Sequence, residues 1–216
     1  MDNLFYSEFK KIIRECGYTN TYKMAWAKAL VEISLEKKFN DREVVILLED
    51  MAQKFLTYYW NQTIFFDLIQ GSNLAKPPLI VQYIKILIEE YYHLVNNRNP
   101  IRFEKIEEFI KSQLFSSYQS CILKIVTVLK RDVSWRFTFL EGKQHNNIYY
   151  YKKGNNQLTI LGKNLTILRE NHQDLFDLIN YKWGLIIESF DSSPRINKKI
   201  KIIDRTKNTK NFTHQI

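Results

Sequence analysis

The sequence predicts an α+β protein, mainly α-helical with a small three-stranded antiparallel sheet in its second half. Apolar residues recur every three or four positions through most of residues 5–129, and this helical spacing returns after residue 164. Glycine and proline number only 6 and 4 among 216 residues, which favours long helices over loops. Between the helical parts, residues 133–160 hold short segments rich in aromatic and β-branched residues, as strands do.

The first three helices are predicted from apolar spacing and from residues that favour helix ends. Residues 5–16 form an opening helix in this interpretation, and Gly17 ends it. The polar pair Asn20-Thr21 can cap a second helix, whose apolar residues run over 24–35. A third helix is expected over residues 44–59, capped by the preceding Asn-Asp pair.

A segment rich in polar residues, over residues 60–78, separates these helices from the next group. Pro77-Pro78 is expected to start a new helix, because proline is favoured at the first helical position. Residues 96–100 form a loop rich in asparagine, which also contains a proline. Further helices are predicted over residues 80–92, 103–114 and 120–129.

The predicted sheet begins where apolar and polar residues alternate strictly, over residues 133–139. Residues 148–152 and 158–160 supply a second and a third strand. Two turns connect these strands, over residues 141–143 and 154–156. From residue 164 to residue 190 the helical period returns, so C-terminal helices are expected to pack on the sheet.

We therefore expect a helical domain over residues 1–130, a sheet-and-helix part over 131–194, and a basic tail over 195–216. Residues 1–130 hold 17 Lys/Arg against 15 Asp/Glu, whereas residues 131–216 hold 15 against 8. In the tail, seven basic residues face only Asp204. A polyanion is the natural partner of such a tail, and the alternative is a solvated terminus that aids solubility.

No apolar run reaches the 18 or more residues that a membrane-spanning helix needs, so no membrane contact is expected. The first residues have neither a basic start nor an apolar core, so we predict no signal peptide and a cytoplasmic protein. Cys16 and Cys121 are interpreted as reduced core thiols, with a disulfide as the alternative.

The sequence contains no positive evidence for an enzyme. None of the four histidines, His93, His145, His172 and His214, has a metal-binding spacing with another histidine or cysteine. No phosphate-binding glycine motif is present either, so no metal or cofactor is expected. The adjacent glutamates at 89–90 and 107–108 are interpreted as solvated charge, because neighbours on a helix do not face each other.

Basic, amide and aromatic residues occur together around Trp60 and again at Trp135-Arg136. Lysine and arginine bind phosphate, while asparagine and glutamine can read adenine edges. In the alternative interpretation, Tyr58 and Trp60 fill the core and the amides satisfy an irregular turn. The candidate nucleic-acid contacts are Arg195, Lys198, Lys199, Lys201, Arg205, Lys207, Lys210, Arg136, Lys76, Gln62 and Gln70.

Several of these motifs resemble a known family. The segments that carry the resemblance are Asn20–Lys23, Tyr59–Gln62 with Gln70, Lys76–Pro78, Arg136-Phe137, Tyr149–Tyr151, Tyr181–Trp183, Ile187–Phe190, Ser193–Arg195 and Lys198–Ile200. Together they are similar to the region that precedes the Cys-rich nuclease module in a group of bacterial HNH endonucleases. The Cys-x-x-Cys and His motifs of that module are absent here.

The resemblance implies a non-catalytic component that engages or targets nucleic acid, DNA being the expected type, in a bacterial nuclease or antiviral defence system. One alternative is an adaptor subunit that docks on an acidic surface of a nuclease or ATPase partner. Another is an HNH endonuclease that has lost its nuclease module.

Overall fold

The computed structural model describes residues 4–39 and 42–190, and it confirms a mainly helical α+β fold. The helices are α1 (Leu4–Glu15), α2 (Tyr22–Glu36), α3 (Leu48–Phe66), α4 (Leu79–Val95), α5 (Phe103–Gln113), α6 (Phe115–Val128), the π-helical turn η1 (Leu129–Val133), α7 (Ser134–Phe137), α8 (Gly162–Glu170) and α9 (His172–Glu188). The strands are β1 (Glu43–Leu47), β2 (Phe139–Leu140), β3 (Lys143–Gln144) and β4 (Gln157–Leu161). The basic tail over 195–216 lies outside the described residues.

The helix ends follow the expected local chemistry in several places. Asn20 Oδ1 accepts a hydrogen bond of 3.0 Å from the backbone N–H of Tyr22 at the start of α2. Helix α4 begins directly after Pro77-Pro78, as predicted. It ends at Asn96, whose φ of 48° is the left-handed conformation that asparagine tolerates at a helix end.

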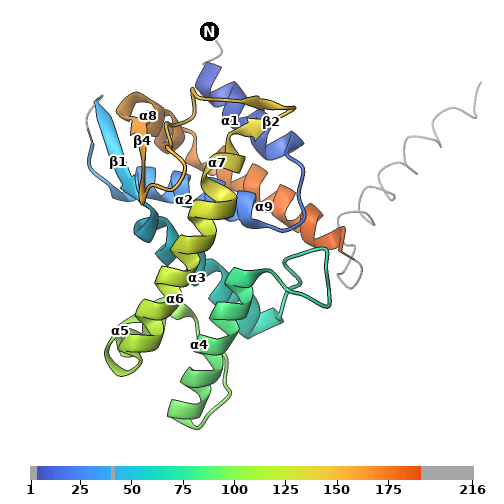
Figure 1. The fold of residues 1–216 in the computed structure, drawn as a ribbon, viewed down its shortest axis with the longest axis vertical. Coiled ribbons are helices and arrows are strands. Elements are labelled where there is room, and N and C mark those ends of the chain that lie inside the picture. Colours follow the sequence, from blue (N-terminus) through green and yellow to red (C-terminus); the bar gives the residue numbers. More distant parts are fainter. Residues whose placement is uncertain (1–3, 40–41, 191–216) are drawn as a thin grey trace, which may run out of the picture.

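Helix α2 lies at the centre of the fold, with α3, α8 and α9 packed around it (Figure 1). Its residues Met24 to Ala27 are all fully buried, although they point in different directions around the helix axis. The small side chains of Ala25, Ala27 and Ala29 leave room for neighbouring helices to approach closely. Because α2 is buried in this way, its first turn, around Lys23, lies against other elements of the fold.

Helices α6, η1 and α7 run as one continuous segment from the lower to the upper part of the molecule (Figure 1). The division expected at residue 130 therefore falls inside this segment, without a linker. Buried residues from Phe5 to Phe190 form a single hydrophobic cluster that includes both parts. Among the described residues, the sequence on both sides of residue 130 thus shares one core.

The strand predicted over residues 133–139 is wrong, because most of that segment is helical. Leu129, Val133 and Phe137 are all buried and are spaced by four residues, which is the period of a helix. Trp135 is only half-buried, and Phe139 is exposed. The apparent alternation was too short to distinguish the two periods, and the preceding helix α6 continues through it.

The three-stranded meander is also corrected, since the described strands form two separate two-stranded antiparallel sheets. Strand β4, which was predicted, pairs with β1, where Val44 lies opposite Ile160. β1 occupies the start of the helix predicted over residues 44–59, and its Val-Val-Ile run suits a strand better than a helix. Residues 148–152 contribute only a bridge between Tyr150 and Thr159.

The second sheet is the hairpin of β2 and β3, and its turn was predicted. Glu141 and Gly142 both have positive φ, at 51° and 77°, as a two-residue hairpin turn requires. The hairpin follows α7 closely in the chain, so Phe139, its first residue, lies near the end of α7.

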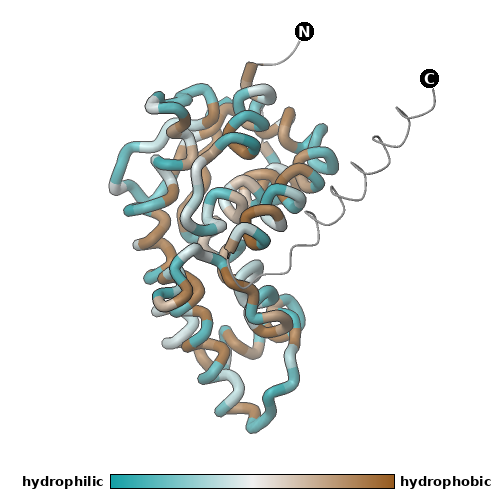
Figure 2. Tube along the Cα trace, turned by 90° about the vertical axis from the view of Figure 1, so that its right-hand side faces the viewer, coloured by the Kyte–Doolittle hydropathy of each residue, from teal (hydrophilic) through white to brown (hydrophobic). Residues whose placement is uncertain are grey.

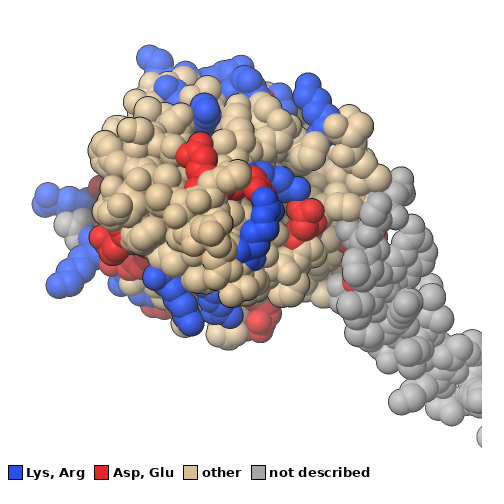
Figure 3. Space-filling view, turned by 90° about the horizontal axis from the view of Figure 1, so that it is seen from below, with Lys and Arg blue, Asp and Glu red and all other residues tan. Residues whose placement is uncertain are grey.

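Hydrophobic and hydrophilic residues alternate along the helices instead of forming one long apolar segment (Figure 2). None of the described helices combines the length and apolar character needed to cross a membrane. Seen from below, the surface is mainly uncharged, and several of its basic side chains stand beside acidic ones (Figure 3). Ion pairs of 2.8 Å join Arg98 to Glu89 and Lys111 to Glu107.

Candidate functional site

A pocket of about 570 Å³ lies between the start of α2 and the η1–α7 segment. This volume is within the range of about 300–1,000 Å³ typical of ligand pockets. One wall is the connection from Gly17 to Asn20 with the first residues of α2, and the other contains Asp132, Trp135 and Arg136. Phe139 completes the lining, which we call the Lys23–Arg136 pocket.

The loop before α4 holds the wall formed by residues 17–20 in place. The backbone N–H of Thr21 donates to the carbonyl of Gln70 at 3.1 Å, and that of Ser72 donates to the carbonyl of Thr19 at 2.9 Å. These bonds make a bridge between Asn20 and Gly71. The start of α2 is therefore anchored by residues far away in the sequence.

A buried hydrogen-bond network lies behind this wall. Thr21 Oγ1 donates to Gln70 Oε1 at 2.7 Å, so Tyr59 must donate the 2.8 Å bond between its hydroxyl and Thr21 Oγ1. Gln70 Nε2 donates to Gln62 Oε1 at 2.6 Å. Gln70 is only 2% exposed, so its amide serves this internal network and is not accessible to a nucleic acid.

The opposite wall is shaped by the π-helical turn η1. Ser134 Oγ donates to the carbonyl of Leu129 at 2.7 Å, and the hydroxyl of Tyr149 donates to the carbonyl of Ser134. Trp135 Nε1 donates to the carbonyl of Arg131 at 2.8 Å. Single π-helical turns inside α-helices are frequent at functional sites, and Trp135 and Arg136 follow this one in α7.

Lys23 is the unusual charged residue of the pocket. Its side chain is half-buried, and among the described residues no carboxylate lies within ion-pair distance of its Nζ. Burial lowers the pKa of Lys23; the Cys16 thiol raises it in part, and repulsion from the Arg136 guanidinium lowers it. The pocket is thus lined by two cations, one half-buried and one exposed.

Arg136 is exposed and only weakly paired. Its Nη2 lies 3.8 Å from Asp132 Oδ1, whereas Arg131 Nη2 lies 2.7 Å from the other oxygen of the same carboxylate. Asp132 therefore pairs mainly with Arg131, so N–H donors of the Arg136 guanidinium remain available to a ligand. An exposed, distant ion pair of this kind contributes little to stability.

Aromatic rings and further cations surround these two groups. The Arg136 guanidinium carbon lies 4.9 Å from the ring centre of Trp135, and Lys153 Nζ lies 4.8 Å from it. On the other wall, Lys182 Nζ lies 5.6 Å from the ring centre of Tyr18. Such distances are typical of cation–π contacts. The arrangement suits a ligand that carries negative charge and flat apolar surface.

The predicted contacts are only partly brought together. Arg136 lines the pocket, although from a helix instead of the predicted strand. Gln62 is half-buried in the internal network, and Lys76 is exposed in the loop before α4, outside the pocket lining. The seven candidate residues of the tail, from Arg195 to Lys210, lie outside the described residues.

Sequence reasoning missed Lys23, Tyr18 and Phe139 as pocket residues. In the sequence, Lys23 stands out only as the end of the Asn20–Lys23 motif. The available signal was its position in the first turn, directly before four residues, Met24 to Ala27, that are all fully buried. Phe139 was assigned to a strand face, so its exposure could not be foreseen.

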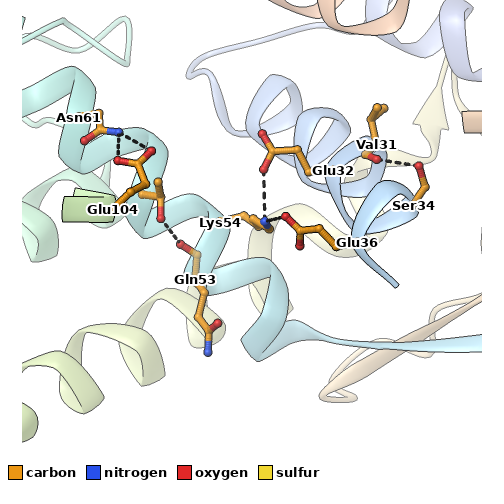
Figure 4. Close-up of polar contacts among 9 residues, drawn as sticks. Val31, Glu32, Ser34, Glu36, Gln53, Lys54, Asn61 and Glu104 are labelled. Atoms are coloured by element: carbon orange, nitrogen blue, oxygen red, sulfur yellow. Dashed lines mark hydrogen bonds and ion pairs between the residues drawn. The ribbon is translucent and has the colours of Figure 1, made fainter. Parts of the chain in front are cut away.

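A second pocket, of about 450 Å³, lies between α2, α3 and α5 and contains several carboxylates. Its charges are already paired. Lys54 bonds both Glu32 and Glu36 of α2, and Asn61 Nδ2 donates to both carboxylate oxygens of Glu104 (Figure 4). These contacts hold α3 to its neighbours. We therefore interpret this second pocket as a structural junction between helices.

Within the described part of the chain, no three His, Cys, Asp or Glu side chains are grouped so that they could hold a metal ion. His145 instead lies 3.5 Å from Glu8, and His172 Nδ1 contacts the carbonyl of Arg169 at 2.7 Å. Both cysteines are buried free thiols, and burial raises the pKa of Cys121 to about 12. None of these groups points to a reaction in the pocket.

Comparisons with models of protein families, with curated proteins and with solved structures gave no significant match. The functional interpretation therefore depends on the pocket itself.

Proposed function

We propose that this chain is a non-catalytic nucleic-acid-binding component, which engages phosphate groups of its ligand through Lys23 and Arg136. The observation that carries the proposal is the half-buried Lys23, which lines a pocket together with Arg136. Among the residues that the structure describes, no carboxylate lies within ion-pair distance of Lys23. Placing an unpaired cation in a half-buried position costs stability, and an anionic ligand would offset that cost.

A nucleic acid matches the groups that line the Lys23–Arg136 pocket better than a small anion does. The pocket is bordered by aromatic rings as well as cations, and bases supply flat surface while the backbone supplies phosphate. The basic tail is expected to add phosphate contacts that do not depend on sequence. The resemblance to the region before the nuclease module of bacterial HNH endonucleases remains a prediction that agrees with this role.

The test measures the binding of labelled oligonucleotides, single-stranded and duplex, by fluorescence anisotropy over a range of salt concentrations. Full-length Lys23→Met and Arg136→Met proteins should each bind more weakly. Each should also reduce the slope of log K against log salt by roughly 0.7 on single strands or 0.9 on duplex for the lost phosphate contact. The matched control is Lys38→Met, an exposed lysine beyond the opposite end of α2.

If Lys23→Met and Arg136→Met bind like Lys38→Met, the pocket does not contact nucleic acid, and the tail from Arg195 to Lys210 becomes the leading candidate. Deleting residues 195–216 would then abolish the salt-dependent binding. If the full-length protein fails to bind at about 50 mM salt, where several phosphate contacts should be visible, the nucleic-acid proposal is wrong.

The adaptor role is a second candidate, and one surface favours it. A groove between α4 and α6 is lined by Tyr83, Ile86 and Cys121, and Ile86 is 54% exposed. Leu123 and Phe115 are also exposed on α6. Exposed apolar side chains such as Ile86 beside a groove are a feature of surfaces that protein partners cover. Competition between nucleic acid and an acidic partner protein for the same chain would distinguish the two roles.

A further inference from the structure

We propose that the Lys23–Arg136 pocket is selective for single-stranded nucleic acid, whose bases stack on Tyr18 and Phe139 while its phosphates contact Lys23 and Arg136. This inference rests on the proposed nucleic-acid binding and adds the form of the ligand. It is carried by the position of the exposed aromatic rings relative to the cations.

Tyr18 and Phe139 are 40% and 43% exposed, and both line the same pocket. A single exposed apolar side chain is ordinary in a folded protein. Two exposed rings from segments far apart in sequence, which converge on one pocket beside Lys23 and Arg136, form a binding surface. Base stacking on such rings contributes about 1–3 kcal/mol per base and tolerates any sequence.

The aromatic rings require unpaired bases. In a duplex, each base is stacked on its neighbours and is paired at its edge, so a ring from the protein cannot cover its face. A single strand can turn its bases toward Tyr18 and Phe139 while its flexible backbone bends into the pocket. The half-buried position of Lys23 also favours a backbone that can enter, because a rigid duplex meets mainly exposed cations.

Two further cations lie near aromatic rings of the pocket, although they are not part of its lining. Lys182 lies near the ring of Tyr18, and Lys153 lies near the ring of Trp135. Lys182 Nζ also donates to the carbonyl of Arg14 at 2.7 Å. We expect both ammonium groups to add electrostatic attraction for a phosphate backbone. Aromatic rings beside a positively charged groove are the combination that binds single strands without sequence preference.

The experiment compares full-length protein binding to a labelled thymidine oligonucleotide of about 12 nucleotides and to a labelled duplex of the same length. The double variant Tyr18→Leu with Phe139→Leu should bind the single strand at least about five-fold more weakly, as the loss of one stacking contact predicts. Its duplex affinity should stay unchanged. The control is Phe66→Leu, which alters an exposed phenylalanine at the end of α3.

The variants Tyr18→Trp and Phe139→Tyr keep an aromatic plane and should retain single-strand affinity. If they too lose affinity, the loss in the leucine variants comes from misfolding and not from lost stacking. If single strand and duplex bind equally, and the leucine variants bind like Phe66→Leu while Lys23→Met weakens both, this inference is overturned but nucleic-acid binding stands. If Lys23→Met and Arg136→Met also leave both affinities unchanged, the binding proposal fails together with it.

Discussion

Trp183 Nε1 donates a hydrogen bond of 3.2 Å to Gln70 Oε1, and this bond ties α9 to the loop before α4. The same oxygen accepts the bond from Thr21 at the start of α2. All three side chains are buried, so the contact joins three distant segments directly behind the Lys23–Arg136 pocket. A buried acceptor shared by two donors is costly to remove.

We therefore expect Gln70→Ala to lower the free energy of unfolding by about 1–3 kcal/mol, because Thr21 and Trp183 lose their acceptor inside the core. Urea denaturation at neutral pH measures this loss. Gln53→Ala, an exposed glutamine on α3, should change stability little. A folded, fully stable Gln70→Ala protein with weakened nucleic-acid binding would instead restore Gln70 as a direct contact.

Substitution of Gly71 tests how closely the loop before α4 must approach its neighbours. A Cβ at Gly71 would lie 2.8 Å from Cγ and 3.0 Å from Cδ of Pro78, whose ring is stiff. Gly71→Ala should therefore destabilise the protein by about 1–3 kcal/mol, as overpacking does. Gly17→Ala is the matched control, since a Cβ there meets nothing within 4 Å. Thermal melts of the two variants should differ clearly, and equal midpoints would contradict this account.

We expect Lys23 to lower the stability of the folded protein and to raise its affinity for nucleic acid. Its pKa is lowered, so the charged form is less favourable in the folded chain than in the unfolded chain. Lys23→Met should therefore unfold at a higher urea concentration than the wild type at pH 7, while its nucleic-acid affinity falls roughly ten-fold through the lost charged contact.

The pH dependence of this difference has a definite sign. Wild-type stability should gain as pH rises through the lowered folded pKa of Lys23, and the gain is complete above the ordinary value of 10.5. The stability advantage of Lys23→Met should thus shrink between neutral pH and that value. An advantage that grows with pH would show that Lys23 is stabilised as a cation in the folded chain.

Trp60 and Trp135 should respond differently to truncation. Trp60 is fully buried against Tyr91 and Phe103, and its Nε1 donates to the carbonyl of Ile101 at 3.0 Å. Trp60→Ala should cost about 3–5 kcal/mol in urea unfolding. Trp135→Ala should cost less, because that ring is only half-buried. A cost under about 1 kcal/mol at Trp60 would contradict its place in the core.

The helices were largely predictable because their signals are local. The spacing of Phe5, Phe9 and Ile12 and the position of Pro77-Pro78 depend only on neighbouring residues, and they predicted α1 and α4 well. The hairpin turn at Gly142 was also predictable, since a positive φ favours glycine there. The same local logic failed over residues 133–139, where two periods fit a short segment equally well.

The sequence by itself determined a mainly helical α+β fold, the ends of several helices and the unbalanced charge of the chain. Only the tertiary structure decided that β4 pairs with β1 and that Lys23 and Arg136 line one pocket. Strand pairing and pocket formation join residues that are distant in the chain, and they depend on how buried surfaces pack as a whole. Such long-range contacts leave no periodic signal in the segments that make them.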